Sequence, residues 1–360
     1  MSTNGALDMD KVNAFARKVV GDITAVQLGT LGVIADRLGL YTALAEGGPA
    51  TSGAFAARAN IEERYAREWL GAMACHGYIA YDDGSKQFRL PPEQAFVLAD
   101  PDSPVYLASF GAMAATMWQN VDRLTEAFRH GGGVPQSAFG HEFWCGFARF
   151  TRPAFRNNLV QDWLPALPHA DAALRAGGSV ADIGCGDGQA LLFLARGYPD
   201  ATMVGYDNYA PAIAAANANA RAAGLADRVR YELCDMTRGI PGQFDLITTF
   251  DVVHDMPKPR PAMRAIKQAL TPDGTYFVLE FNMSGDLQEN IDHPLGLGAF
   301  GYAMSTNYCL TQALAAGGEG TGTCMGEAKL REFARAGGFT QFRTLDFPQN
   351  PFNLFYELRA

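Results

Sequence analysis

Residues 180–188 read Val-Ala-Asp-Ile-Gly-Cys-Gly-Asp-Gly and follow the pattern D-x-G-x-G-x-G. The apolar run 179–183 predicts a strand that ends at this pattern, and the run 189–196 predicts a helix that begins after it. Because glycine lacks a Cβ atom, such a loop can turn sharply, and a ligand can lie against its bare peptide groups. The stretch therefore predicts a nucleotide-cofactor loop, although a lone glycine pattern would be weak evidence.

The next two predicted strands end in residues that suit such a cofactor. The run 201–207 ends in Asp207, 19 residues after the last glycine of the loop, where a carboxylate can accept both hydroxyls of a ribose. The run 229–234 leads into Asp235 and Met236, an acid and an apolar side chain that suit the amine and the ring of an adenine.

Strands and helices continue to alternate beyond this point. Strands are predicted at 244–250 and 275–280, with a helix over 261–270 and a turn at 271–274 between them. This alternation is typical of a doubly wound α/β sheet.

The succession resembles the class I S-adenosylmethionine-dependent methyltransferases, from about Ala173 to the C-terminus. Dehydrogenase loops usually read G-x-G-x-x-G, whereas this loop reads D-x-G-x-G-x-G with Asp182 near the end of its strand. This difference favours S-adenosylmethionine over NAD as the cofactor. Segments 341–347 and 352–358 look like the antiparallel hairpin that closes the seven-stranded, Rossmann-like sheet of that family. The cofactor-binding residues that the resemblance implies are Asp182, Gly184, Gly186, Gly188, Asp207, Asn208, Asp235, Met236 and Phe250.

The first hundred residues follow a different pattern. Two short runs, 78–81 and 87–90, joined by Asp-Asp-Gly-Ser, predict a two-stranded hairpin. Apolar residues at helical spacing precede it, and helices followed by such a hairpin make a winged-helix domain. The helices are predicted at 9–28, 31–45, 52–59 and 61–76.

A winged helix raises the hypothesis of DNA binding, which charge disfavours. Residues 1–100 hold nine Lys and Arg against twelve Asp and Glu, a net charge of −3. The candidate recognition helix contains three glutamates and two arginines. Because phosphate contacts dominate DNA affinity, we expect no nucleic-acid partner.

Composition sets further limits. The chain has 360 residues, 48% of them hydrophobic, and a net charge of −9, which indicates a soluble acidic protein of about two domains. Its longest apolar stretches are interrupted by charge or glycine, so we expect no membrane contact and a cytoplasmic location. The six cysteines are scattered without a C-x-x-C pair, so we expect neither disulfides nor a metal site.

A closer resemblance covers nearly the whole chain. The stretches 131–140, 250–256, 286–309 and 351–357 look like those of bacterial winged-helix methyltransferases. This resemblance implies a small-molecule methyl acceptor and a homodimer, and it carries no particular substrate. We expect a winged-helix dimerisation domain at 1–100, a helical linker forming part of the acceptor pocket at 101–170, and the cofactor-binding methyltransferase domain at 171–360.

His254 is the candidate catalytic residue. Small-molecule O-methyltransferases of this layout carry a His-Asp-Trp motif whose histidine is the general base, and here the motif reads His254-Asp255-Met256. An imidazole with an ordinary pKa near 6.5 suits removal of a hydroxyl proton near neutral pH. The alternative is that His254 only caps a helix or orders the cofactor loop. Residues expected to bind the acceptor are Trp118, Trp144, Glu280, Tyr302 and Asn307.

Three functions compete. The first is methyl transfer to a small molecule, to oxygen or to sulfur; a thioether acceptor such as methylthio-hydroxybutyrate would need no base and would suit aromatic walls. The second is a transcriptional regulator that senses S-adenosylmethionine and binds DNA through its winged helix. The third is an enzyme that keeps the cofactor for a reaction other than methylation.

Overall fold

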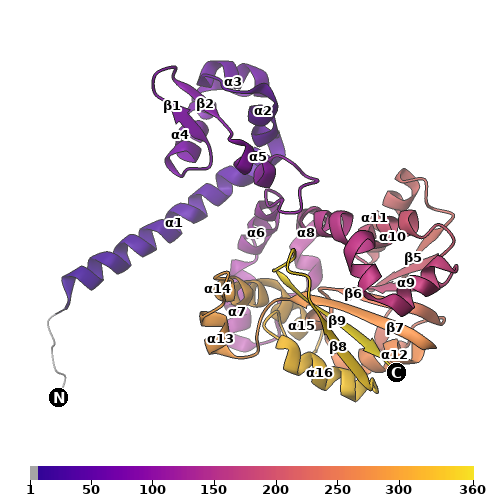
Figure 1. Cartoon of the computed structure of the whole chain (residues 1–360). Coiled ribbons are helices and arrows are strands. Elements are labelled where there is room, and N and C mark those ends of the chain that lie inside the picture. Colours follow the sequence, from indigo (N-terminus) through magenta and orange to yellow (C-terminus); the bar gives the residue numbers. More distant parts are fainter. Residues whose placement is uncertain (1–6) are drawn as a thin grey trace, which may run out of the picture. The chain divides into compact units, whose positions relative to one another are not determined.

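The structure, a computed structural model, describes residues 7–360. The chain divides into two compact units between Ala115 and Thr116, inside the helix α6 (Phe110–Trp118). Figure 1 labels their elements along the chain. Each unit has its own apolar core.

The N-terminal unit contains a winged-helix domain, as predicted. Its core is centred on Trp69, whose ring centroid lies 5.4 Å from that of Tyr41 and 5.7 Å from that of Phe55. The short strands pair antiparallel, from Ala80 with Arg89 to Asp82 with Gln87. The elements of this domain are α1 (Met9–Leu38), α2 (Leu40–Gly47), α3 (Ser52–Ala59), α4 (Glu63–Cys75), β1 (Ala80–Asp82), β2 (Gln87–Arg89) and α5 (Pro92–Leu98).

The helix α1 corrects one prediction, because residues 9–38 form a single helix of 30 residues instead of ending near residue 28. An internal glycine costs a helix only about 1 kcal/mol, and no proline interrupts this segment. Asp8 caps its start by accepting from the backbone N–H groups of Asp10 and Lys11 at 3.1 and 3.2 Å. Gly39, at φ +63°, ends it in the left-handed conformation.

Most of α1 is exposed, and Ala35 is its one buried residue. By length and composition alone, α1 could also cross a membrane. The sequence analysis did not anticipate this, because it took the apolar runs to be interrupted. A surface of this kind also suits a partner helix. The large apolar side chains exposed along it are Met9, Val12, Phe15, Val19, Val20, Ile23, Val26, Ile34 and Leu38.

The C-terminal unit is built on the predicted seven-stranded sheet. The strand order is β5-β4-β3-β6-β7-β9-β8, and β9 alone runs antiparallel to its neighbours. This confirms the Rossmann-like sheet and its C-terminal hairpin. The strands are β3 (Ser179–Ile183), β4 (Thr202–Asp207), β5 (Val229–Leu233), β6 (Phe244–Phe250), β7 (Leu270–Phe281), β8 (Gln341–Leu345) and β9 (Asn353–Arg359).

Helices cover both faces of this sheet (Figure 1). Alternate side chains of β7 enter opposite cores, because successive residues of a strand point to opposite faces. Phe277 packs with Trp163 and Leu191 on one face, and Tyr276 packs with Met263 and Phe333 on the other. The first face carries α9 (Pro168–Arg175), α10 (Gln189–Gly197) and α11 (Ala210–Ala222), and the second carries α12 (Pro259–Ala269) and α16 (Gly326–Gly337).

Two helical segments far apart in sequence lie side by side near the sheet. The backbone N–H of Val134 donates to the carbonyl oxygen of Thr311 at 3.1 Å and to its Oγ1 at 2.8 Å. The rings of Phe143 and Tyr308 approach to 4.4 Å between centroids. The first segment holds α7 (Val121–His130), η1 (Gln136–Phe139), α8 (Gly140–Ala154) and η2 (Phe155–Trp163), and the insert after β7 holds α13 (Leu287–Ile291), α14 (Gly298–Met304), η6 (Ser305–Cys309) and α15 (Leu310–Ala315).

Candidate active site

A cavity of about 630 Å³ lies at the carboxyl ends of β3, β4 and β6, where open α/β sheets bind ligands. The glycine loop forms one part of its wall, and α8 with η6 forms another. The predicted cofactor-binding residues that line it are Asp182, Gly184, Gly186, Asp207, Asn208, Met236 and Phe250.

The glycines of the loop lie where the chain turns and where neighbouring side chains approach closely. Gly184 has φ +72°, and a Cβ atom on it would lie 2.7 Å from the nearest methyl group of Val252. Gly186, at φ +55°, donates its backbone N–H to Asp207 Oδ2 at 3.0 Å. Gly188 lies at the start of α10 and packs against the ring of Tyr231, so it shapes the loop without lining the cavity.

Two carboxylates hold the loop and face the cavity. Asp182 is 2% exposed and accepts from Thr248 Oγ1 at 2.7 Å, and burial raises its pKa to about 7. Asp207 Oδ1 accepts from the backbone N–H of Tyr209 at 2.8 Å, and burial also raises the pKa of Asp207. Asp235 differs from the prediction, because its side chain caps the turn η4 (Met236–Arg238) through Thr237 and does not line the cavity.

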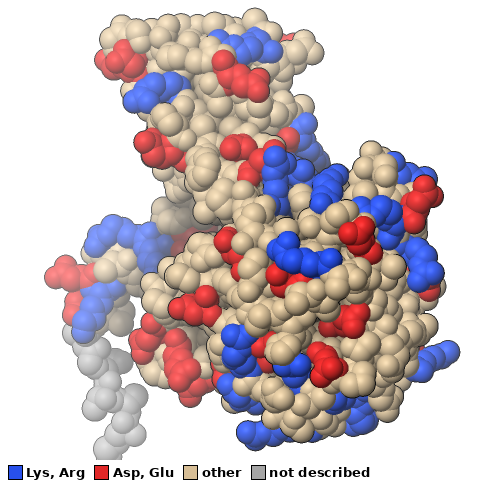
Figure 2. All heavy atoms as spheres, turned by 45° about the vertical axis from the view of Figure 1, so that its right-hand side comes forward, with Lys and Arg blue, Asp and Glu red and all other residues tan. Residues whose placement is uncertain are grey.

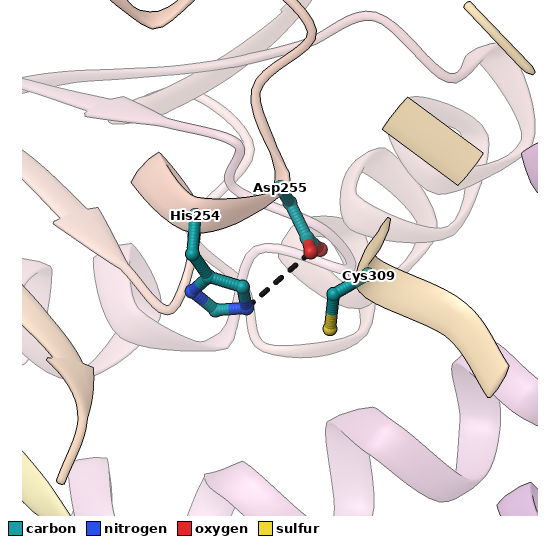
Figure 3. A group of neighbouring side chains, drawn as sticks. All are labelled: His254, Asp255 and Cys309. Atoms are coloured by element: carbon teal, nitrogen blue, oxygen red, sulfur yellow. Dashed lines mark ion pairs between the residues drawn. The ribbon is translucent and has the colours of Figure 1, made fainter. Parts of the chain in front are cut away.

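Around His254 the structure shows a buried polar centre (Figure 3). The His254 ring is 1% exposed, and its Nδ1 pairs with Glu280 Oε2. Its Nε2 lies 3.3 Å from Asp255 Oδ1. Of these three side chains only Asp255 lines the cavity, so His254 lies behind it.

The charge state of His254 follows from this geometry. Burial alone lowers the pKa of His254, but the carboxylates of Glu280 and Asp255 outweigh it and raise this pKa well above its ordinary value. Burial raises the pKa of Asp255, opposed by His254. Because Nδ1 pairs with Glu280 and the Asp255 carboxyl lies beside Nε2, the protonated imidazolium is the favoured form of His254.

Cys309 completes a group that could bind a metal. One donor atom each from His254, Asp255 and Cys309 lie within 4.8 Å of one another (Figure 3). Such nitrogen, oxygen and sulfur donors suit zinc. The ion pair of His254 with Asp255 and a hydrogen bond between Cys309 and Asp255 account for the same contacts without one.

Aromatic side chains form another part of the cavity wall. The ring centroid of Trp144 lies 5.5 Å from that of Tyr209 and 5.7 Å from that of Tyr308. The indole Nε1 of Trp144 is buried and has no hydrogen-bond partner among the described residues. A buried donor without a partner is costly, so this N–H is suited to an oxygen of a bound ligand.

One of the five acceptor-binding residues predicted from the sequence lines the cavity, and the other four do not. Trp144 lines the cavity, whereas Trp118, Tyr302 and Asn307 do not. Glu280 is also absent from the wall, because it pairs with His254 instead. Tyr308, which the sequence places in the insert beside Asn307, does line the cavity, and wall residues that the sequence did not single out for the acceptor include Gln312, Asp251, Asp255 and Cys145. Among these residues, the sequence offered a signal only for Asp251 and Asp255, because they are polar and directly follow β6.

Two families match the chain. Residues 174–316 match the family described as Methyltransferase domain, and residues 27–100 match the family described as Rv2258c-like winged HTH domain. The O-demethylpuromycin-O-methyltransferase of Streptomyces alboniger is 27% identical over 63% of this chain and 61% of its own length. A ubiquinone biosynthesis O-methyltransferase of Pseudomonas paraeruginosa is 28% identical over 40% of this chain and 60% of its own length. The chain thus matches about three fifths of the length of these relatives.

Solved structures share the fold over the full chain. The mitomycin 7-O-methyltransferase is 20% identical with a TM-score of 0.66, covering 98% of this chain and 100% of that one. Human N-acetylserotonin methyltransferase, solved with S-adenosylmethionine, is 17% identical with a TM-score of 0.68, covering 100% of this chain and 99% of that one.

Fold and family matches agree. The chain carries a Rossmann-like fold with a segment that matches a methyltransferase domain, preceded by a segment that matches a winged HTH domain. The D-x-G-x-G-x-G loop and Asp207 are the parts of the site that suit S-adenosylmethionine by geometry.

Proposed function

We propose that this chain transfers the methyl group of S-adenosylmethionine to an oxygen atom of a small, flat acceptor. The observation that carries the proposal is that one cavity is lined both by the glycine loop and by the aromatic side chains of α8 and η6. The methyl carbon and the acceptor atom can therefore meet in a single cavity. Both named relatives are O-methyltransferases.

Orientation supplies most of the rate enhancement in this account. In an in-line displacement the acceptor atom forms a bond to the methyl carbon while the carbon–sulfonium bond breaks. Holding the two about 3 Å apart in line can supply roughly 7 to 11 kcal/mol. Trp144, Phe143 and Tyr308 are the rings available to hold a flat acceptor.

A hydroxyl acceptor must also lose a proton. The sequence analysis assigned this role to His254, but its Nε2 faces Asp255 and its ring lies behind the cavity wall. We therefore propose that Asp255 takes the proton and that His254, held by Glu280, positions Asp255 and stabilises its charge. The raised pKa of Asp255 makes it a stronger base than an exposed aspartate.

The alternatives have less support. A thioether acceptor would need no base, and the polar centre behind Asp255 would then have no catalytic task. A DNA-binding regulator would need basic side chains free on α4, but Arg67 pairs with Glu63 at 2.7 Å and Arg64 pairs with Glu68. Figure 2 shows basic and acidic residues interspersed over the face it draws. If the cofactor served a reaction other than methylation, the aromatic part of the cavity wall would have no methyl acceptor to bind.

We further propose a cytoplasmic homodimer formed through α1. Val12, Val19 and Val26 recur every seven residues, and all three are exposed, with Phe15 and Ile23 beside them. This spacing is typical of a helix that packs along a second helix. The apolar surface of α1 would then be covered by a second copy instead of a membrane.

The proposal is tested with purified enzyme, S-adenosylmethionine and a panel of phenols, thioethers and amines. We expect S-adenosylhomocysteine to form with phenolic hydroxyl acceptors. Trp144→Phe, which keeps the ring and removes the N–H, should raise the KM for the acceptor with little change in cofactor affinity. Turnover with thioethers alone, insensitive to changes at Asp255, would contradict transfer to oxygen.

A further inference from the structure

Asp251 is a polar residue of the cavity wall that has no part in the proposed methyl transfer. It follows β6 directly and has φ +57°, a left-handed backbone conformation that few residues other than glycine adopt. Its backbone N–H donates to the carbonyl oxygen of Leu279 at 2.8 Å. Such a conformation persists where the surrounding structure holds it, and it is frequent at functional sites.

The side chain of Asp251 has an amide partner and no cation. Asn353 Nδ2, from β9, lies 3.1 Å from Oδ1 and 3.3 Å from Oδ2. Among residues 7–360 the structure gives this carboxylate no ion pair. Burial raises the pKa of Asp251 well above its ordinary range, and Glu280 raises it further. Asn353 therefore orients the carboxylate without neutralising it.

The surroundings of Asp251 are acidic. Burial, Glu280 and Asp255 raise the pKa of Asp251, and His254 opposes them. These neighbours favour the protonated form of Asp251, so a ligand that brings positive charge beside it would favour the carboxylate and be attracted to it. S-adenosylmethionine brings a sulfonium, and its demethylated product, S-adenosylhomocysteine, does not.

Strand register places Asp251 beside the start of the glycine loop. Asp182 pairs with Thr248 across β3 and β6, so Gly184 and Asp251 lie just beyond the ends of neighbouring strands. Val252, the next residue, packs directly against Gly184. Both Gly184 and Asp251 line the same cavity.

We propose that Asp251 is the counter-ion of the cofactor's sulfonium, so that the site prefers charged S-adenosylmethionine to its neutral product. This rests on the proposed use of S-adenosylmethionine as methyl donor. The carboxylate then acts in binding and product release: once the methyl group leaves as CH₃ bonded to the acceptor, the sulfur becomes a neutral thioether and the attraction to Asp251 is lost. Asp251 is a selectivity residue for cofactor against product.

Isothermal titration of Asp251→Asn tests this with three ligands: S-adenosylmethionine, S-adenosylhomocysteine and sinefungin, whose amine places a positive charge where the sulfonium lies. Asn has the same shape and tolerates the left-handed backbone. We expect affinity for the two cationic ligands to fall about tenfold, the scale of one charge-assisted contact, and affinity for S-adenosylhomocysteine to change less than about twofold.

Asp187→Asn is the matched control, because Asp187 is a second carboxylate of the same cavity wall, bonded to Gln189 and Asn219. It should leave the ratio of the affinities for S-adenosylmethionine and S-adenosylhomocysteine unchanged. Equal losses for all three ligands in Asp251→Asn, no loss for any, or an equal change of ratio in the control would each overturn the proposal.

Two further measurements keep the result interpretable. If Asp251→Asn fails to fold, Asn353→Ala, which releases the carboxylate, should shift the same ratio in the same direction by a smaller factor, and an unchanged ratio would overturn the proposal. A bound metal would be another source of positive charge near Asp251, so the unmodified protein is also analysed for metal. Stoichiometric zinc at His254, Asp255 and Cys309 would overturn the proposal. Wild-type protein that binds none of the three ligands would instead contradict the proposed function itself.

Discussion

His254 Nδ1 and Glu280 Oε2 form a buried ion pair between the segments that follow β6 and end β7. The other oxygen of Glu280 accepts from the backbone N–H of Val253 at 2.7 Å, so both carboxylate oxygens are engaged. Glu280 thus fixes the ring orientation and directs Nε2 toward Asp255. The pair joins two neighbouring strand ends, which explains why Glu280 is absent from the cavity that its position in sequence suggested.

Glu280→Gln should change how stability depends on pH. The raised pKa of His254 means that its ion pair stabilises the fold fully below the unfolded value of about 6.5, and this contribution is lost as pH rises through the raised folded value. In the variant this pH dependence should weaken. Thermal unfolding followed from neutral to alkaline pH measures it; parallel curves for variant and wild type would contradict the assigned charge of His254.

Asp255→Asn should lower turnover with a hydroxyl acceptor by about a hundredfold or more, since it removes the group that takes the proton. His254→Gln should lower turnover less and leave cofactor affinity unchanged. In the unmodified enzyme the rate of the chemical step should fall as pH drops through the raised pKa of Asp255. Single-turnover measurements at saturating acceptor give this profile. A larger effect of His254→Gln than of Asp255→Asn would return the base role to His254.

Asp207→Ala should weaken S-adenosylmethionine binding by about 2 kcal/mol or more, the range for lost hydrogen bonds to a charged group. The structure adds a reason, because Asp207 also holds the loop through Gly186 and the chain at Tyr209. Calorimetry measures the affinity, and Asp200→Ala, at an exposed site outside the cavity wall, is the control. Unchanged affinity would show that the ribose is held elsewhere.

Val19→Glu should convert the proposed dimer to a monomer, because it places a charge within the exposed apolar stripe of α1. Light scattering should give twice the chain mass of 38.7 kDa for the wild type and the single chain mass for the variant. Arg17→Glu lies on the opposite face of the helix by its spacing and should remain dimeric. A wild-type monomer at micromolar concentration would refute the dimer.

The sheet could be predicted from sequence because each of its signals is local. β3 and β6 begin and end at the predicted residues, and the glycines of the loop fall where the turn requires them. Asp207 and Phe250 could be placed because the carboxyl ends of parallel strands meet at one edge. The sequence predicted two helices separated at Gly29 and Thr30, but both residues lie inside the continuous helix α1.

The acceptor side could not be predicted in the same way. Tyr308 and Trp144 meet through a contact between segments more than a hundred and fifty residues apart, and no pattern in either segment announces it. Trp118 and Tyr302 have the same residue chemistry but lie outside the cavity wall. The sequence offered His254 as the base by its motif, and only the side-chain geometry shows that Asp255 lies between it and the cavity.

The central claim, methyl transfer to a small-molecule acceptor, is tested most directly with S-adenosylmethionine carrying a deuterated methyl group. Purified protein is incubated with this cofactor and a metabolite extract of its host, and the products are followed by mass spectrometry. The account predicts S-adenosylhomocysteine together with a small molecule that carries the deuterated methyl on oxygen, both absent with Asp207→Ala. Cofactor that binds but stays unconsumed, with no labelled small molecule in the extract, would contradict it.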